Sequence, residues 1–285
     1  MTIERVGVVG CGLMGSGIAE VCARAGLDVV VREVTPEAAE AGRARLVKSL
    51  DRGVSAGKLT EAERDAAFAN LAFTTDFADL ADRQLVVEAV VEDEAMKVAI
   101  FQELDKVVTA ADAILASNTS SIPIMKLGTV TQRPEQVIGV HFFNPVPVLR
   151  LVELVTSLMT SEATIDRANA FATHQLSKRV IRSQDRAGFV VNYLLIPYLL
   201  SAIRMMESGF ASADDIDTGM VEGCSHPMGP LRLTDLIGLD TTLAVAESLY
   251  QEFKEPLYAA PPLLSRMVDA GLLGRKTGRG FYQYK

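Results

Sequence analysis

Short runs of apolar and β-branched residues alternate with longer segments of helical periodicity through the first two-thirds of the chain. The short runs predict strands at Val6–Val9, Val29–Val31, Leu85–Glu88, Ala113–Ala116, Val137–Val140, Leu151–Val155 and Arg179–Arg182. The longer segments predict helices at Leu13–Ala25, Pro36–Ala56, Glu61–Ala69, Glu94–Val108, Ile122–Val130 and Glu162–Leu176. Apolar strands that alternate with helices indicate an α/β domain with a parallel sheet covered on both faces.

After Gly188 the strand-like runs disappear and only helical patterns remain. These patterns predict helices at Phe189–Ser208, Ser212–Glu222, Leu231–Phe253 and Pro262–Ala270. We therefore expect a Rossmann-type doubly wound α/β domain over residues 1–186, followed by a smaller all-α domain over residues 187–285. The helix Phe189–Ser208 is apolar on nearly all sides, which fits a homodimer interface as well as the core of a monomer. We expect a homodimer.

Composition narrows the class of protein. Hydrophobic residues make up 49% of the 285 residues, but the sequence has no uncharged apolar stretch of about 20 residues that would predict a membrane span. The N-terminus enters a strand pattern almost at once, without the basic end and apolar run of a secretory signal. Cys11, Cys22 and Cys224 lack zinc-site spacing, and we expect them to be reduced thiols packed in the core. These features predict a cytoplasmic protein with no membrane partner and no metal.

The formal net charge of −8 argues against a nucleic-acid partner, whose binding needs a basic face. It does not exclude a small anionic ligand, because local charge decides such binding. Arg45, Lys48 and Arg52 follow the spacing i, i+3 and i+7 and share one face of a predicted helix. This basic stripe fits contacts with phosphates or a solvated surface, and the spacing alone does not separate the two.

A glycine-rich turn, Gly10-Cys-Gly12-Leu-Met-Gly15, lies between the first predicted strand and the first predicted helix. Gly10 permits a tight turn, Gly12 lets the backbone approach a pyrophosphate, and Gly15 lets helix and strand pack closely. The helix begins at Leu13 and Met14, so that its N-terminus faces the phosphates. Turn glycines without a cofactor are the alternative, but this strand–turn–helix context favours a dinucleotide site.

The second predicted strand ends at Glu33, eighteen residues after Gly15. A carboxylate at this position can accept hydrogen bonds from both ribose hydroxyls and repels a 2′-phosphate, so it favours NAD over NADP. The neighbouring Arg32 could hold a 2′-phosphate, which leaves NADP as the less favoured cofactor.

Two later strands run into polar segments at the sheet edge where doubly wound folds bind their ligands. One segment is Ser117-Asn-Thr-Ser-Ser121, and the other begins with His141. Oxidation of an alcohol requires a base for the hydroxyl proton while hydride leaves the same carbon, and imidazole titrates in the right range. We therefore predict His141 as the acid–base residue, with a buried structural histidine as the alternative. His174 reads as a helix-surface residue and His226 as loop packing.

Glu153 is a carboxylate within the apolar run Leu151–Val155. A buried acid needs a partner, and His141 would supply one. A carboxylate beside a general base fixes its tautomer and stabilises its cation. Strand alternation leaves an outward-facing Glu153 as the alternative.

Several motifs in one order over essentially the whole chain resemble the 3-hydroxyacyl-CoA dehydrogenase family, especially its bacterial members that act on 3-hydroxybutyryl-CoA. They are Gly10-Cys-Gly-Leu-Met-Gly15, Ser117-Asn-Thr-Ser-Ser121, Gly139-Val-His-Phe-Phe-Asn-Pro-Val-Pro147, Leu151-Val-Glu153, Gly188-Phe-Val-Val-Asn192, Pro227-Met-Gly-Pro230 and Gly274-Arg-Lys-Thr-Gly-Arg-Gly-Phe281. The chain departs from the family at Ala187, where a proline is usual.

The resemblance implies a role for each matching residue. The catalytic His–Glu pair falls on His141 and Glu153, and Ser120 and Asn192 contact the substrate, Ser120 also touching the cofactor. Further cofactor contacts fall on Glu92, Lys97, Asn144 and Lys276, and a coenzyme A contact falls on Ser49. The last of these favours the ligand-binding interpretation of the basic stripe.

The sequence thus predicts an NAD-dependent oxidoreductase that interconverts (S)-3-hydroxyacyl-CoA and 3-ketoacyl-CoA, with a Rossmann-type NAD-binding domain and a helical substrate and dimerisation domain. One alternative is a related dehydrogenase that acts on a free sugar acid. Another is a dinucleotide-sensing protein without catalysis, whose expected signature is the loss of His141 or Glu153.

Overall fold

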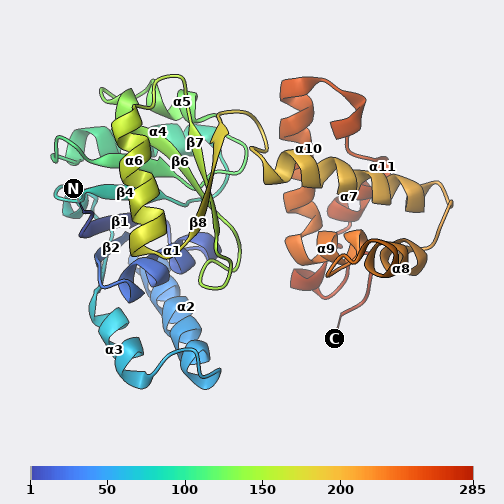
Figure 1. The fold of residues 1–285 in the computed structure, drawn as a ribbon, viewed down its shortest axis with the longest axis horizontal. Coiled ribbons are helices and arrows are strands. Elements are labelled where there is room, and N and C mark those ends of the chain that lie inside the picture. The colour runs from blue at the N-terminus through green and yellow to red at the C-terminus, as the bar shows by residue number, and fades with distance from the viewer. Residues whose placement is uncertain (1, 285) are drawn as a thin grey trace. The chain divides into compact units, whose positions relative to one another are not determined.

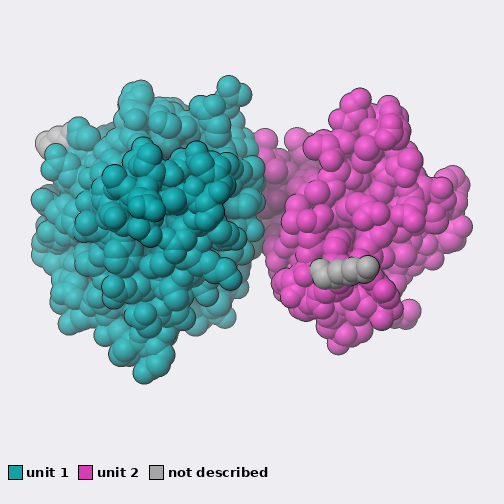
Figure 2. All heavy atoms as spheres, turned by 90° about the horizontal axis from the view of Figure 1, so that it is seen from below, with its two compact units in different colours: residues 1–186 teal, residues 187–285 magenta. Residues whose placement is uncertain are grey.

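The computed structural model describes residues 2–284, which form two compact units divided between Arg186 and Ala187 (Figures 1 and 2). The first unit, teal in Figure 2, is an α/β sandwich, and the second, magenta, is all helical. The predicted fold class is therefore confirmed. Within the described residues, no helix is both long and apolar enough to cross a membrane.

The first unit is built on one eight-stranded sheet with the order β3-β2-β1-β4-β5-β6-β7-β8. The strands are β1 Arg5–Val9, β2 Asp28–Arg32, β3 Leu71–Thr74, β4 Leu85–Glu88, β5 Ile114–Ser117, β6 Val137–Phe142, β7 Leu151–Thr156 and β8 Arg179–Gln184. The chain leaves β1 toward β2 and β3, then returns to the other side of β1 at β4. This reversal creates the crevice at which doubly wound sheets bind ligands.

The expectation of an entirely parallel sheet is wrong for the last two strands. β1 to β6 are parallel to one another, but β7 pairs antiparallel with β6. β8 pairs parallel with β7 and therefore also runs opposite to the first six strands. Only residues 143–150 connect β6 to β7. A link this short cannot carry the helical crossover that parallel strands require.

Helices cover both faces of the sheet (Figure 1). They are α1 Leu13–Arg24, α2 Pro36–Ser55, α3 Glu61–Ala69, α4 Glu94–Val107, α5 Ile124–Gly128 and α6 Glu162–Ala170, with short 3₁₀ turns at Phe77–Leu80 and Pro134–Gln136 and a π turn at Phe171–Gln175. Side-chain caps fix the starts of several of these helices. At α3, Thr60 and Glu63 form a capping box, and at α4, Asp93 accepts the N–H of Met96.

The core follows the alternation of side chains along the strands. Val6, Val8, Val29 and Val31 pack with apolar residues of α1, α2 and α6 in one continuous cluster. The intervening strand residues are buried too, as in sheets with helices on both faces.

β3 was not predicted. Its residues Leu71–Thr74 form a four-residue edge strand that is only partly buried, so the run carries no strong apolar signal.

The helix predicted over Ile122–Val130 is shorter in the structure, where α5 spans Ile124–Gly128 and follows Pro123.

The second unit consists of α7 Val191–Glu207, α8 Ala213–Cys224, α9 Pro230–Ile237, α10 Leu239–Phe253 and α11 Pro262–Asp269, with 3₁₀ turns at Pro256–Tyr258 and Arg275–Thr277. The single helix predicted over Leu231–Phe253 is wrong. Gly238 separates α9 from α10 with a φ of +104°, a conformation that glycine alone adopts readily.

Two buried aspartates hold the C-terminal segment against α8 and α9. Asp217 caps α9 through the N–H groups of Leu231 and Arg232 and also accepts the hydroxyl of Tyr282. Asp235 accepts the N–H groups of residues 281 and 282 and the hydroxyl of Tyr284, each at 2.8–2.9 Å. Burial, together with the hydrogen bond to Asp235 and its charge, raises the pKa of Tyr284 to about 12, so the phenol stays a donor at neutral pH.

The cysteines differ in burial. Cys11 and Cys22 are buried as expected, and burial raises the pKa of each thiol to about 12, which makes them unreactive. The prediction of core packing is wrong for Cys224, because this residue is exposed at the end of α8.

Asp235→Asn tests the anchoring of the C-terminal segment. The amide nitrogen would face donors that now meet a carboxylate oxygen, so we expect a loss of about 1–3 kcal/mol in the free energy of unfolding. Urea unfolding followed by circular dichroism measures it. Asp269→Asn, at an exposed position of α11, is the control and should change stability by less than about 0.5 kcal/mol. Equal stability of the two variants would contradict the anchoring role.

Candidate active site

The glycine-rich turn has the backbone that a bound pyrophosphate requires. Gly10 has a φ of +88°, and a Cβ on Gly15 would collide with the carbonyl oxygen of Gly10. A Cβ on Gly12 would meet nothing within 4 Å, so the backbone there borders open space. Gly12 is also the N-cap of α1 and offers no side-chain cap, which leaves the first N–H groups of the helix to an external acceptor.

Leu13 and Met14 form the start of α1. Leu13 is 63% exposed, whereas Met14 is half-buried against the core cluster. Their backbone N–H groups therefore lie at the open end of the helix, where an anion is stabilised by the helix dipole.

Glu33 lies at the end of β2, directly beside the glycine-rich turn. Its Oε1 accepts the N–H of Cys11 at 2.5 Å and its Oε2 accepts the N–H of Val34 at 3.2 Å. Arg32 is turned to other partners: its guanidinium stacks 3.9 Å from the ring centre of Phe77, and its Nε donates to the carbonyl of Thr75. The Glu33 carboxylate therefore contacts the turn directly, whereas the Arg32 guanidinium does not.

A cavity of about 540 Å³ opens beside this turn. Glycine-rich backbone, Glu33 and Arg32 form its polar side, and Val90, Val91 and Ile100 form part of its apolar side. Apolar walls with a few placed polar groups are typical of a nucleotide site. The open backbone, the uncapped helix and this cavity together fit a dinucleotide.

His141 and Glu153 meet because β6 and β7 are antiparallel. The two residues are direct cross-strand partners, so their side chains project from the same face of the sheet. His141 Nδ1 lies 2.7 Å from Glu153 Oε2, with Glu153 fully buried and His141 6% exposed. The ring of Phe143 packs at 4.6 Å from the imidazole centre. Nδ1 is the ring nitrogen that faces the carboxylate, and Nε2 lies on the opposite side of the ring.

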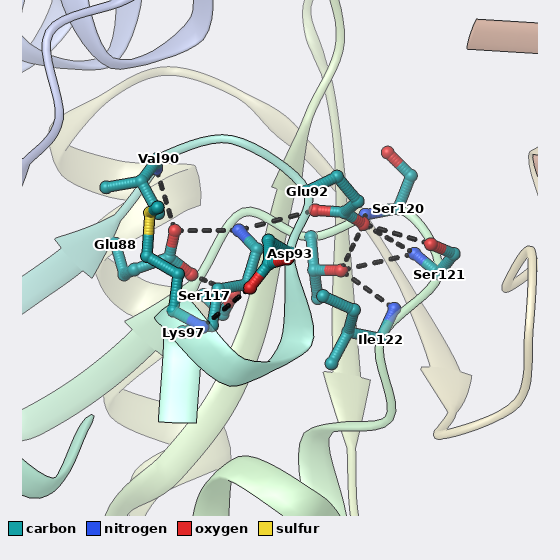
Figure 3. A network of polar contacts seen from close by, with 11 residues as sticks. Glu88, Val90, Glu92, Asp93, Lys97, Ser117, Ser120, Ser121 and Ile122 are labelled. Atoms are coloured by element: carbon teal, nitrogen blue, oxygen red, sulfur yellow. Dashed lines mark hydrogen bonds and ion pairs between the residues drawn. The ribbon is translucent and has the colours of Figure 1, made fainter. Parts of the chain in front are cut away.

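The segment after β5 is held by Glu92. Its Oε1 accepts the hydroxyl of Thr119 at 2.5 Å, the N–H of Ser120 at 2.9 Å and the N–H of Ser121 at 3.1 Å (Figure 3). Burial raises the pKa of Glu92, but the charge of Lys97 and these hydrogen bonds outweigh it and lower the pKa below its usual value. Glu92 is therefore ionised at neutral pH and fixes the position of Ser120.

Lys97 connects this segment to the interior of the sheet. The fully buried Lys97 reaches Glu88 Oε1 at 2.7 Å and Glu92 Oε2 at 3.3 Å (Figure 3). Glu88 was not predicted to belong to this cluster of polar contacts, although a carboxylate at the end of the apolar strand Leu85–Glu88 was a signal. Its other oxygen accepts the hydroxyl of Ser117 at 2.6 Å.

The basic stripe lies on the exposed side of α2. Arg45 Nη1 donates to the carbonyl of Cys11 at 2.6 Å and so also supports the glycine-rich turn. Lys48 and Arg52 border a surface hollow of about 490 Å³, and Ser49 is half-buried on the same helix.

The remaining predicted site residues lie elsewhere. Asn144 is exposed in the loop between β6 and β7. Asn192 is half-buried in the first turn of α7, and Lys276 pairs with Asp240 at 2.5 Å; both belong to the second unit. His174 is exposed, as expected, and His226 Nδ1 meets the hydroxyl of Tyr198 at 3.1 Å.

Comparison with known proteins identifies the family. Residues 5–186 match the NAD binding domain of 3-hydroxyacyl-CoA dehydrogenase, and residues 188–284 match its C-terminal domain. The chain is 64% identical over 282 residues to a 3-hydroxybutyryl-CoA dehydrogenase of Mycobacterium tuberculosis, covering 99% of both chains.

Solved structures agree with this result. The crystal structure of M. tuberculosis FadB2 superimposes with a TM-score of 0.99 at 64% identity, covering 100% of both chains. The (S)-3-hydroxybutyryl-CoA dehydrogenase PaaH1 of Ralstonia eutropha superimposes with a TM-score of 0.94 at 47% identity, again covering 100% of both. The resemblance in the motifs is therefore confirmed: this chain belongs to the 3-hydroxyacyl-CoA dehydrogenase family.

Proposed function

We propose that this protein is an NAD-dependent (S)-3-hydroxybutyryl-CoA dehydrogenase that interconverts the 3-hydroxyacyl and 3-ketoacyl thioesters. The observation that carries the proposal is the buried His141–Glu153 pair, which lies on strands of the same sheet as the glycine-rich turn. The names of the relatives from M. tuberculosis and R. eutropha support the four-carbon substrate and, for the latter, its stereochemistry.

Bound NAD supplies the hydride acceptor. Nδ1–H of His141 donates to Glu153, so Nε2 accepts the proton of the 3-hydroxyl as hydride leaves C3. Glu153 keeps the imidazole in this tautomer and stabilises the imidazolium that forms. In the reverse direction the same proton returns from Nε2 to the 3-keto oxygen.

The other site residues bind and orient. Ser120, positioned by Glu92, donates to the substrate oxygen and borders the cofactor, while Glu92 and Asn144 contribute further cofactor contacts. Lys97, which is fully buried, acts on the cofactor site through Glu92. Asn192 holds the thioester end, and Ser49 with the basic stripe receives coenzyme A phosphates. In this proposal the second unit contributes Asn192 to substrate binding and Lys276 to cofactor binding, and it forms a homodimer.

Glu33 is the basis for proposing NAD rather than NADP. Its carboxylate is fixed beside the turn by the N–H groups of Cys11 and Val34 and would repel a 2′-phosphate.

Initial rates with acetoacetyl-CoA, longer 3-ketoacyl-CoAs and free 3-keto acids, each with NADH, test the proposed substrate. A preference for free acids would overturn the proposal.

His141→Ala removes the proposed acid–base group. We expect turnover of acetoacetyl-CoA with NADH to fall about 10²- to 10⁴-fold, with NADH affinity retained. Stopped-flow rates and NADH fluorescence titrations measure the two quantities. His174→Ala, at an exposed position, is the control and should behave as wild type. A folded, NADH-binding His141→Ala protein with normal turnover would show that another residue is the base.

Glu153→Gln keeps the shape of the side chain but removes its charge. The amide cannot stabilise the imidazolium, so we expect kcat to fall about 10²- to 10⁴-fold with little change in KM. Glu162→Gln, exposed at the start of α6, is the matched control. If both variants keep the wild-type kcat, the pairing has no catalytic role.

Glu33→Gln tests cofactor selection. Loss of the carboxylate removes the repulsion of a 2′-phosphate, so the kcat/KM ratio of NADH over NADPH should fall on the order of tenfold. Glu61→Gln, exposed on α3, should leave the ratio unchanged. A ratio in Glu33→Gln equal to that of wild type would assign the selectivity to other groups.

A further inference from the structure

Three charged side chains form a connected cluster at the carboxyl end of β4: Glu88, Lys97 and Glu92, called here the acidic triad (Figure 3). Glu88 and Lys97 are each 0% exposed, and the Glu92 side chain is 36% exposed. Both carboxylates share Lys97 as their ion-pair partner. The triad therefore contains two negative charges against one positive charge.

The contacts define the charge of each member. Glu88 Oε1 accepts from Lys97 and from the N–H of Val90 at 2.7 Å each, and Oε2 accepts the hydroxyl of Ser117 at 2.6 Å. Both oxygens of Glu88 thus act as acceptors, which describes a carboxylate. Glu92 is ionised because the charge of Lys97 and its hydrogen bonds lower its pKa. Lys97 Nζ lies within ion-pair distance of both carboxylates.

The strand register locates the triad relative to the cofactor site. Glu88 is the parallel partner of Val9, the residue before the glycine-rich turn, and of Ser117, which begins the segment that contains Ser120. Val90, bound to Glu88, lines the cavity beside that turn. Glu33 marks the adenosine side at β2, so the nicotinamide end must cross the ends of β4 and β5 to reach His141 on β6.

The nicotinamide ring is the part of the cofactor whose charge changes. Hydride transfer breaks the C3–H bond of the substrate and carries its two electrons to the ring, which goes from cationic to neutral, while the hydroxyl proton goes to His141. A fixed charge near the ring therefore acts differently on the two redox states. Because Glu88 is fully buried, solvent screens its charge less than that of Glu92.

We propose that the excess negative charge of the acidic triad favours the cationic ring of NAD over the neutral ring of NADH, with Glu88 as the less screened of its two carboxylates. Glu88 is then a positioning residue for Lys97 and also determines the redox-state preference of cofactor binding. This inference rests on the proposed use of NAD. A unit charge acting over roughly 10 Å at an effective dielectric constant of about 20 changes a binding ratio on the order of tenfold.

Glu88→Gln separates this charge effect from a structural role. The amide retains the shape, an acceptor for Val90 and Lys97, and a hydrogen bond to Ser117, but makes the triad neutral overall. Titration calorimetry with NAD and with NADH gives the ratio Kd(NAD)/Kd(NADH), which should rise on the order of tenfold over wild type. Glu94→Gln is the matched control: Glu94 begins the same helix, pairs with Lys126 outside the triad and is half-exposed, so its ratio should stay within about twofold.

The inference is overturned if Glu88→Gln folds and its ratio equals that of wild type, or if both affinities fall by the same factor, as a purely structural role would give. Should Glu88→Gln not fold, Glu92→Gln decides: it also makes the triad neutral, and its ratio must rise even if both affinities fall. A wild-type protein that binds neither NAD nor NADH would instead overturn the proposed function.

Discussion

The antiparallel pairing of β7 with β6 is the constraint on which the rest of the site depends. It makes His141 and Glu153 direct partners on one face of the sheet and buries the carboxylate completely. Burying a carboxylate costs several kcal/mol unless it is paired, and the imidazole, 2.7 Å away, is one of the groups that compensate Glu153. The same contact orients the imidazole, and one interaction therefore serves both stability and the proposed chemistry.

The other strand ends are tied to this pair and to one another. Asn118, after β5, accepts the N–H of Phe142 in β6 at 2.8 Å, so the segments carrying Ser120 and His141 are directly joined. Asp185 accepts the first N–H groups of α5, which follows the Ser120 segment. Loops held in this way need little reorganisation when a ligand binds, which is the condition for efficient transition-state stabilisation.

Local signals were sufficient to predict the elements of the site whose chemistry is unusual for their setting. The glycine spacing, a histidine at a strand end and an acid within an apolar strand each break a local pattern, and each can be recognised without a partner. The fold class followed from the alternation of strands and helices. The family resemblance, rather than spacing, supplied Ser120, Glu92 and the coenzyme A thioester.

What could not be predicted depends on contacts between distant segments. The direction of β7 depends on the length of its connection to β6, and β3 gains its stability from β2 rather than from its own sequence. Gly238 reads as a tolerated glycine within a helical pattern, and only its positive φ shows a break. Glu88 was recognised only as the end of a strand. Its hydrogen-bond partners Lys97 and Ser117 lie 9 and 29 residues away in the sequence, so no local pattern predicts the cluster.

The buried charges of the first unit have a common logic in the proposed reaction. Replacing a buried ion pair by apolar residues is often neutral or stabilising, so stability alone does not account for the fully buried Lys97 and Glu88. In the proposed oxidation, bound NAD would supply a cationic ring that becomes neutral, and His141 would become cationic. The acidic triad is proposed to favour the charge at its first location, and Glu153 lies 2.7 Å from the second. A carboxylate therefore lies near each of the two groups that are cationic, the ring before the reaction and the imidazole after it. Each cation is stabilised by a nearby negative charge in a low-dielectric site.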